Sequence, residues 1–270
     1  MVNTTGAPLK EPLEFQKTSG AGVHAAALSH SFGELEVLRG LGLDAEPGEV
    51  LGIVGPSGCG KSTLLEIVSG LREPGSGELR VGGESGPEAR LARCTYMPQR
   101  DLLLPWLSAI DNAALALRVR GEGKAAARKA AAPLFERFGL AGFESSRPAE
   151  LSGGMRQRVA FLRTLIAGKP VLLLDEPFAS LDAITRAEMQ QWLAGALEGD
   201  RHTTLLVSHD VEEALYLSDR VLVLSARPGR VLESIDSPAP RLADRAGAVS
   251  SPEFAEARGH ALRILEAGAR

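Results

Sequence analysis

Three short apolar runs along the chain predict the strands of one buried sheet. They cover residues 50–54, 171–175 and 203–208. The second run holds four apolar residues in a row without alternation, which is typical of a parallel strand that is covered on both faces. Segments with helical spacing separate the three runs. The pattern therefore favours an α/β fold with a parallel sheet at its centre.

Alternating segments on either side of this core predict antiparallel pairing. Residues 23 to about 45, together with 78–81, alternate enough to form an antiparallel β-layer. Residues 221–224 and 230–233 predict a hairpin around Pro228-Gly229. After about residue 237 the chain is rich in Ala, Arg and Pro, and we expect one short helix there, ending near Leu265.

A helical lobe is predicted for residues from about 101 to 165. Ser108 and Asp111 have the spacing of a capping box that opens one of its helices. The alanine-rich segment 123–139 is also helical, but Pro133 interrupts it. A proline removes one hydrogen bond and clashes with the preceding turn, so we expect a kink or a restart of the helix there.

No internal repeat is present, so the layout predicts a single domain. A terminal segment flanks it on each side. We expect a flexible N-terminal tail over residues 1–22, the domain over 23–236, and a C-terminal extension over 237–270.

Composition narrows the possible functions. The chain has 270 residues and a formal net charge of −4, so nothing indicates a nucleic-acid footprint. Its two cysteines cannot build a four-cysteine zinc site, and they fit a reducing compartment. No run approaches the ~20 apolar residues that span a bilayer, and the N-terminus lacks a signal pattern. We therefore expect a protein that crosses no membrane and transports nothing by itself.

A glycine-rich segment after the first strand predicts a phosphate-binding loop. Residues 55–63 fit the pattern G-x-x-x-x-G-K-[ST], with a strand before them and a helix after them. The glycines let successive N–H groups and a helix N-terminus point at one anion. A chance glycine-rich turn would lack this context. The residues expected to contact a nucleoside triphosphate are Gly55, Pro56, Ser57, Gly58, Cys59, Gly60, Lys61, Ser62 and Thr63.

Within this loop, two side chains carry specific predictions. Lys61 would reach the β- and γ-phosphates of the nucleotide, and the Ser62 hydroxyl would ligate Mg²⁺. Cys59 lies where the backbone makes the contacts, so we expect no redox role for it.

Two carboxylates end the second strand. Asp175 lies at the edge where open α/β sheets bind their ligands, and we expect it to hold Mg²⁺. Glu176 follows it and would orient or deprotonate the attacking water, because phosphoryl transfer depends mainly on positioning and charge neutralisation. A carboxylate pair that merely ends a strand is the alternative, and the phosphate-binding loop argues against it.

The segment Leu151-Ser-Gly-Gly-Met155, followed by Arg156-Gln-Arg158, resembles the signature sequence of ATP-binding cassette (ABC) ATPases. The resemblance extends over roughly residues 23–233. It implies a P-loop cassette with a RecA-like parallel core, an antiparallel β-layer and a helical lobe. It also implies that Ser152, Gly153 and Gly154, at a helix start, close over the γ-phosphate held by a second copy. Two ATP molecules would thus lie between two chains in a head-to-tail homodimer.

Four further residues match functional positions of the family. Gln99 matches the glutamine that senses Mg²⁺ and the γ-phosphate, and His209 matches the switch histidine. Asp182, in Ser180-Leu-Asp182, matches the loop that runs across the dimer interface. Phe32 matches the aromatic residue that stacks on adenine, although a lone aromatic residue is as often part of the core.

The segments 99–106 and 175–186 are similar to those of nitrate, sulfonate, taurine and thiamine-pyrimidine-precursor importer ATPases. This resemblance implies a peripheral subunit at the cytoplasmic face of the membrane. Its partners would be two permease subunits and, indirectly, an extracytoplasmic binding protein. An exporter ATPase and a DNA-repair ATPase stay open as alternatives, but the second class carries long insertions that are absent here. A ribosome-acting cassette would need two cassettes in one chain.

Two positions were left open by the sequence. The signature ends in Met155 where the family usually has glutamine, which puts in doubt any polar contact of that side chain across the interface. Trp106 would either anchor a permease helix on the surface or pack in the core of the lobe, and the two alternatives are equally supported.

Overall fold

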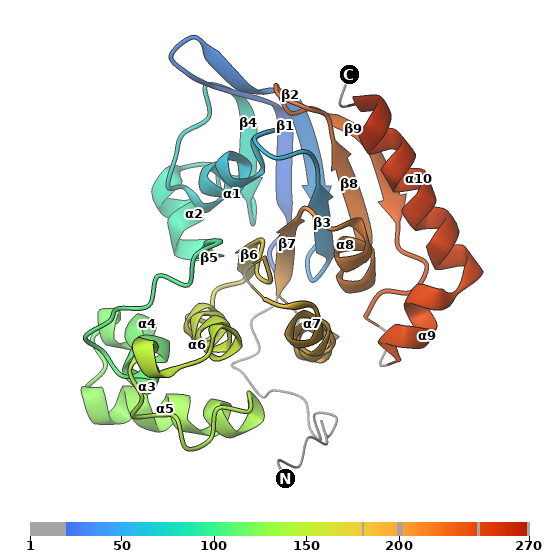
Figure 1. The fold of residues 1–270 in the computed structure, drawn as a ribbon. Coiled ribbons are helices and arrows are strands. Elements are labelled where there is room, and N and C mark those ends of the chain that lie inside the picture. The colour runs from blue at the N-terminus through green and yellow to red at the C-terminus, as the bar shows by residue number, and fades with distance from the viewer. Residues whose placement is uncertain (1–19, 180, 199–201, 242–243, 269–270) are drawn as a thin grey trace.

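The computed structural model describes residues 20–179, 181–198, 202–241 and 244–268. A six-stranded sheet forms its centre, in the order β5-β6-β7-β3-β8-β9 (Figure 1). The first five strands pair in parallel and β9 pairs antiparallel to β8. The strand bounds are β3 Val50–Val54, β5 Cys94–Met97, β6 Val171–Asp175, β7 Thr203–Ser208, β8 Arg220–Leu224 and β9 Val231–Asp236.

The three strands predicted from apolar runs are all present and lie side by side. Every residue of β3, β6 and β7 is buried. Successive residues face opposite sides of a strand, so Leu172 and Leu174 enter one core cluster while Val171 and Leu173 enter the other. Both faces of the sheet are thus covered, which is why these strands show no polar alternation.

A second sheet of three antiparallel strands covers one side of the central sheet (Figure 1). Its order is β2-β1-β4, with β1 Val23–Phe32, β2 Leu35–Ala45 and β4 Ser76–Val81. The predicted antiparallel layer is therefore confirmed. Apolar residues of this sheet and of helix α1, Lys61–Ser69, form one core cluster with β3. Helix α2, Pro87–Arg93, follows β4 and leads into β5.

Helices α7, Ala183–Glu198, and α8, Val211–Leu217, belong to the other core cluster, on the opposite face of the sheet. The predicted terminal hairpin is present as β8 and β9. The expected short C-terminal helix is wrong in extent. Two helices follow β9, α9 Arg245–Ser250 and α10 Pro252–Gly268, and Phe254 and Ala261 of α10 are fully buried. Ala257, Ile264 and Leu265 of α10 also pack against this core, but the alanines and arginines between these positions hide the periodicity in the sequence.

The helical lobe lies below the central sheet in Figure 1 and contains α3 to α6. Their bounds are α3 Ala109–Ala113, α4 Leu115–Val119, α5 Lys124–Arg137 and α6 Gly153–Leu165, with a 3₁₀ turn at Pro148–Glu150. The expected restart at Pro133 does not occur, since α5 continues through it. Pro133 has no N–H to donate to the carbonyl of Lys129. Both residues are exposed, so water can bind that carbonyl instead.

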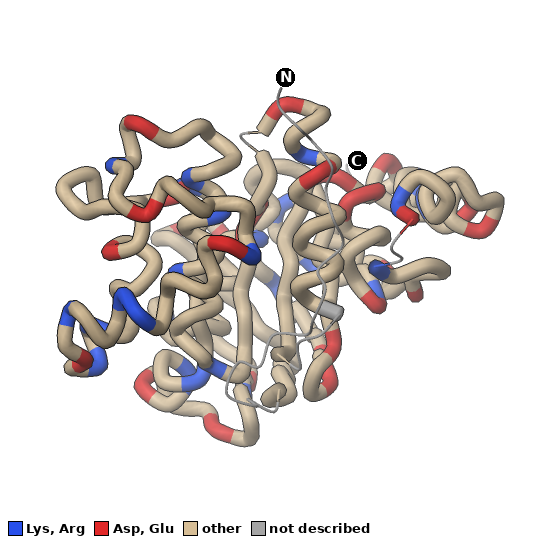
Figure 2. The backbone as a smooth tube through the Cα atoms, turned by 90° about the horizontal axis from the view of Figure 1, so that it is seen from below, with Lys and Arg blue, Asp and Glu red and all other residues tan. Residues whose placement is uncertain are grey.

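Charged residues of both signs are interspersed around the molecule, while the central strands carry few of them (Figure 2). Among the described residues, no helix is long and apolar enough to cross a bilayer. The N-terminal tail expected over residues 1–22 falls almost entirely outside the described residues.

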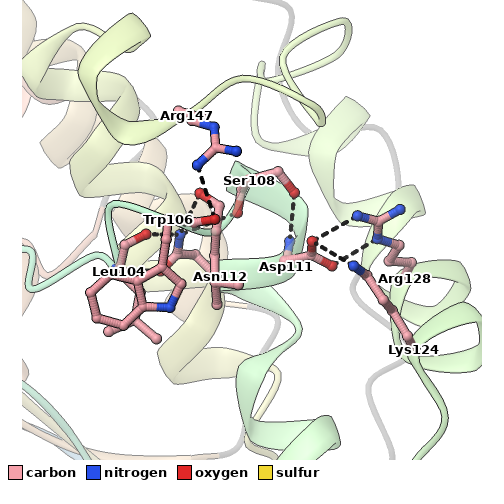
Figure 3. Close-up of polar contacts among 9 residues, drawn as sticks. Leu104, Trp106, Ser108, Asp111, Asn112, Lys124, Arg128 and Arg147 are labelled. Atoms are coloured by element: carbon pink, nitrogen blue, oxygen red, sulfur yellow. Dashed lines mark hydrogen bonds and ion pairs between the residues drawn. The ribbon is translucent and has the colours of Figure 1, made fainter.

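Asp111 forms only half of the predicted capping box. Its N–H donates to Ser108 Oγ at 3.4 Å, but its carboxylate pairs with Arg128, whose Nε and Nη2 donate at 2.7 Å each (Figure 3). Lys124 Nζ lies 3.5 Å away. The hydrogen bonds from Arg128 lower the pKa of Asp111 from 3.8 to about 2. This contact joins α3 to α5 and so holds the lobe together.

Asp111→Asn is expected to destabilise the protein by about 1–2 kcal/mol at pH 7, because it removes a charge-assisted contact that is partly exposed. The folded pKa lies below the unfolded one, so the stabilisation is present above pH 3.8 and lost as pH falls towards 2. Urea unfolding between pH 7 and pH 3 measures it. The difference in the free energy of unfolding between wild type and variant should become smaller below pH 4. A difference that does not change with pH would contradict the ion pair.

Candidate nucleotide-binding and catalytic site

The loop between β3 and α1 has the backbone shape that an anion cradle requires. Gly58 and Gly60 adopt positive φ angles of 77° and 107°. A Cβ on Gly60 would lie 2.7 Å from Leu38 and 2.8 Å from Val37, so only glycine fits there. Helix α1 begins at Lys61 without a side-chain cap. Its first N–H groups are therefore available to a bound anion.

Lys61 lies in the middle of this cradle and is only 6% exposed. Its Nζ donates to Gly55 O at 2.8 Å and to Pro56 O at 3.1 Å. Among the residues that the structure describes, no carboxylate lies within ion-pair distance of Lys61 Nζ. A buried ammonium group held only by carbonyls is an incomplete arrangement, and a phosphate oxygen would supply the missing charge.

Ser62 and Asp175 bring two oxygen donors together beside Lys61. The Ser62 hydroxyl is hydrogen-bonded to Asp175, and Tyr96 Oη donates to Asp175 Oδ2 at 3.0 Å. Burial raises the pKa of Asp175, and these two hydrogen bonds oppose the rise. A hydroxyl and a buried carboxylate next to a phosphate cradle fit a hard divalent cation such as Mg²⁺, which prefers oxygen ligands and retains water.

No group of three or more His, Cys, Asp or Glu side chains that could hold a metal exists within the described ranges. A cation bound by Ser62 and Asp175 would thus depend on phosphate and water oxygens for its other ligands. The residues present fit a metal that arrives with the nucleotide.

Glu176 is the point at which the predicted catalytic residues meet. Gln99 Nε2 donates to Glu176 Oε2 at 3.0 Å, and His209 Nδ1 lies 3.2 Å from the same oxygen. Asp175 pairs with Val207 across β6 and β7, so both strands end at one edge of the sheet, where β3 also ends. This common edge explains why residues far apart in the sequence converge.

The backbone of Glu176 is strained. Its φ is +46°, in the left-handed region that non-glycine residues rarely adopt, and its N–H donates to Val207 O at 2.9 Å. Such strain costs about 1–3 kcal/mol and persists where surrounding contacts enforce it. The turn aims the carboxylate at Gln99 and His209 instead of continuing the strand.

Phe32 lies at the end of β1 and is 44% exposed, so it is not a core residue. The Arg72 guanidinium lies over its ring at 4.6 Å, and the His30 ring meets it edge-on at 4.9 Å. Arg72 follows α1, so the segment after this helix reaches Phe32. The ring offers an exposed aromatic surface that already receives a planar cation.

The signature residues begin helix α6 as predicted. Ser152 is the N-cap, and its Oγ accepts a hydrogen bond from Met155 N at 3.2 Å. A Cβ on Gly154 would lie 2.9 Å from Thr185 Cγ2, so this glycine permits α6 to approach the start of α7. Met155 is partly buried against the core cluster of the lobe. Its side chain thus faces the chain's own interior, which explains why an apolar residue is accepted there.

The structure leaves two groups of predicted site residues apart from the cradle. No described hydrogen bond connects Ser152, Gly153 or Gly154 with the phosphate-binding loop. Asp182 caps α7, where its Oδ1 accepts from Ile184 N at 3.2 Å and Thr185 N at 3.1 Å. Its neighbour Ser180 lies outside the described residues.

Tyr96 is the residue of this site that the sequence reasoning missed. It lies on β5, which was not predicted, and that strand pairs with β6 so that Tyr96 is opposite Leu173. Burial, together with the nearby Asp175 carboxylate, raises the pKa of Tyr96, so the phenol remains a hydrogen-bond donor. The signal was present in Cys94–Met97, a short run of β-forming residues directly before the predicted Gln99.

Comparison with known proteins agrees with this geometry. The family model described as ABC transporter matches residues 38–179, more than half of the chain. A formylaminopyrimidine import ATP-binding protein of Halalkalibacterium halodurans is 44% identical over 71% of this chain and 74% of its own length. An aliphatic sulfonates import ATP-binding protein of Rhodococcus jostii is 47% identical over 77% of this chain and 81% of its own.

Solved structures give the same family. A post-hydrolysis dimer of the ATP-binding cassette MJ0796 with ADP and Pi superposes with a TM-score of 0.71 at 28% identity, covering 80% of this chain and 99% of that one. A dimeric structure of the same cassette gives a TM-score of 0.70. With the cradle, the paired carboxylates and the signature helix in place, these matches show that the chain belongs to the ABC transporter family as an ATP-binding and ATP-hydrolysing cassette.

Proposed function

We propose that the chain energises solute import by binding and hydrolysing MgATP between two copies of itself. The observation that carries this proposal is the convergence of Gln99 and His209 on one oxygen of Glu176, next to Asp175 and the phosphate cradle. Adenine stacks on Phe32, and the triphosphate lies along residues 55–63 with Lys61 at its β- and γ-phosphates.

Ser62 and Asp175 would hold Mg²⁺, with Gln99 nearby, and the cation would neutralise phosphate charge when bound. Tyr96 keeps the Asp175 carboxylate turned towards Ser62. Glu176 orients the attacking water and accepts its proton, while His209 and Gln99 hold the carboxylate in place. Lys61 stabilises the charge on the transferred phosphoryl group.

The second copy completes each site through Ser152, Gly153 and Gly154. The N-terminus of α6 presents a serine hydroxyl and exposed N–H groups, which suit a γ-phosphate. Among the described residues of one chain no hydrogen bond links them to the cradle, so a head-to-tail homodimer gives them a ligand. Asp182 lies at the start of α7 and belongs to the same interface. The dimeric cassettes that superpose on this chain support this arrangement.

The relatives favour import over export or a DNA-repair role, because the formylaminopyrimidine and aliphatic sulfonates relatives are both import ATP-binding proteins. The solute is a small anion of the nitrate, sulfonate or taurine type, or a pyrimidine precursor. The cassette works at the cytoplasmic face of the membrane with two permease subunits and, indirectly, an extracytoplasmic binding protein. Reconstitution with these subunits tests the proposal: ATP-dependent uptake supports it, and ATP hydrolysis that never depends on the permease contradicts it.

The permease contact is proposed at the segment around Trp106. This side chain is 65% exposed, so the alternative that it packs in the core of the lobe is wrong. Asn112, fully buried, holds the segment from inside, since its Oδ1 accepts from Leu104 N at 2.7 Å and its Nδ2 donates to Leu104 O at 3.1 Å (Figure 3). Arg147 Nη1 donates to Trp106 O at 3.1 Å. A fixed backbone thus presents a large apolar side chain to the surface.

Trp106→Ala is expected to keep the melting temperature and basal ATPase rate but to weaken permease binding by about 2 kcal/mol or more, as for an exposed aromatic anchor. Pull-down with the permease and thermal unfolding measure the two effects. Trp192→Ala is the matched control. Because Trp192 packs against Phe138 and Phe161, this substitution should lower the stability by about 3–5 kcal/mol. Undiminished permease binding by Trp106→Ala would contradict the contact.

A further inference from the structure

Helix α8 carries a carboxylate that the proposed mechanism does not use. Glu213 is 4% exposed, and within the described part of the chain no cation lies within ion-pair distance of it. Gln190 Nε2, from α7, donates to Glu213 Oε2 at 2.9 Å. The Ser208 side chain lies near the same carboxyl group. Burial raises the pKa of Glu213. A buried acid of this kind is stable only while its hydrogen-bond partners stay in place.

Ser208 directly precedes the proposed catalytic histidine. Ser208 is the last residue of β7, and its Oγ accepts a hydrogen bond from Asp210 N at 3.0 Å. Asp210 in turn caps α8, since its Oδ1 accepts from Glu212 N at 2.9 Å and Glu213 N at 3.2 Å. His209 lies between these two anchored residues, so their positions fix the backbone from which its ring reaches Glu176.

At its other end, the same chain of hydrogen bonds leads to the C-terminal helices. Arg245, the first residue of α9, donates from Nε to Gln190 Oε1 at 3.0 Å and from Nη2 to Glu212 Oε1 at 2.9 Å. Arg258 of α10 donates from Nη1 to Glu212 Oε2 at 2.8 Å. Figure 1 shows α9 and α10 beside α8, away from the helical lobe.

Arg245 determines how the Gln190 amide can act. An amide has one acceptor end and one donor end, and the guanidinium of Arg245 can only donate. Arg245 therefore fixes Oε1 of Gln190 towards itself and leaves Nε2 for Glu213. Without Arg245 the Gln190 amide keeps only its hydrogen bond to Glu213, so its orientation is held less firmly.

We infer that Arg245 and Gln190 are positioning residues for ATP hydrolysis, and that they couple the C-terminal helices to His209 through Glu213 and Asp210. This inference rests on the proposed catalytic role of His209. It gives the extension after β9 a part in turnover, and it separates Arg245, which reaches Gln190, from Arg258, which reaches only Glu212.

The test compares Arg245→Met with Arg258→Met in the full-length chain, each in the wild-type and the His209→Ala background. Both substitutions remove one ion pair to Glu212, but only the first releases the Gln190 amide, and it also removes the guanidinium that lies 5.6 Å from the centre of the Tyr216 ring. Small misplacement of a catalytic group costs up to about a hundredfold, so Arg245→Met is expected to lower kcat about tenfold with an unchanged KM for ATP. Arg258→Met should keep the wild-type kcat, and thermal unfolding measures the stability that each variant loses, which should be larger for Arg245→Met because Arg245 makes more contacts.

The double variants decide the route. Arg245→Met should lower kcat no further when His209 is already alanine or when Gln190→Met has removed the amide. Three results would overturn the inference. They are an equal loss of kcat from Arg245→Met in the His209→Ala background, an equal loss of kcat in both arginine variants, and a wild-type kcat for Arg245→Met. If His209→Ala alone keeps the full rate, the proposed role of His209 fails, and that outcome overturns the coupling to His209 with it.

Discussion

Glu176→Gln is expected to slow ATP hydrolysis by about 10²–10⁴-fold while MgATP binding is retained. Loss of general-base or water-positioning help has this magnitude. Glutamine keeps the shape of the side chain but cannot accept a proton from water. The binding residues of the cradle are untouched, so nucleotide affinity measured by fluorescence titration should stay near the wild-type value. Steady-state phosphate release then measures turnover.

The same variant should accumulate an ATP-bound dimer, visible by size-exclusion chromatography with MgATP and absent without it. Glu136→Gln, an exposed carboxylate on α5, is the matched control and should hydrolyse ATP at the wild-type rate. A wild-type rate in Glu176→Gln would show that the convergence of Gln99 and His209 on this carboxylate has no part in catalysis.

Ser152→Arg is expected to abolish hydrolysis while the chain still binds ATP in its own cradle. The arginine would fill the space that a γ-phosphate from another copy needs at the start of α6. Ser152→Ala is the control for the lost hydroxyl, since it removes the hydrogen bond to Met155 N at a cost of about 1 kcal/mol, and the proposed γ-phosphate contact, without filling that space. ATPase assays and nucleotide titration separate the two effects.

Mixing Ser152→Arg chains with Lys61→Ala chains makes this prediction sharper. Each variant alone should be inactive. A mixed dimer should contain one site with both defects and one with neither, so partial activity should return as the two proteins are combined. A mixture that stays inactive, although cross-linking shows mixed dimers, would count against the head-to-tail arrangement.

The sequence predicted the parts of the fold that depend on local patterns. The buried strands ending at Val54, Asp175 and Ser208 have continuous apolar residues because both faces of the sheet are covered. The Ser152 cap was also predicted, since a capping serine contacts an N–H only three residues away. The resemblance to ABC ATPases then identified which polar residues at these strand ends matter.

Contacts between distant segments could not be predicted in the same way. The Tyr96 hydroxyl reaches Asp175 only because β5 pairs with β6, and the short run Cys94–Met97 carries little periodicity. The Gln190–Glu213 contact likewise joins two helices whose packing the sequence does not specify. At Pro133 a local rule predicted a kink or a restart of the helix; the restart does not occur, since α5 continues through the proline.

The positive φ of Glu176 also lay beyond sequence reasoning. Nothing in the residue type indicates a left-handed backbone, which arises because the Glu176 N–H stays paired with Val207 while the chain turns off the sheet.

A structure of the Glu176→Gln chain with MgATP tests the head-to-tail arrangement most directly. Two ATP molecules are expected between two copies, each bound by residues 55–63 of one chain and contacted at its γ-phosphate by Ser152 of the other. A single chain that closes over its own nucleotide, or a dimer in which Ser152 lies away from both γ-phosphates, would contradict it.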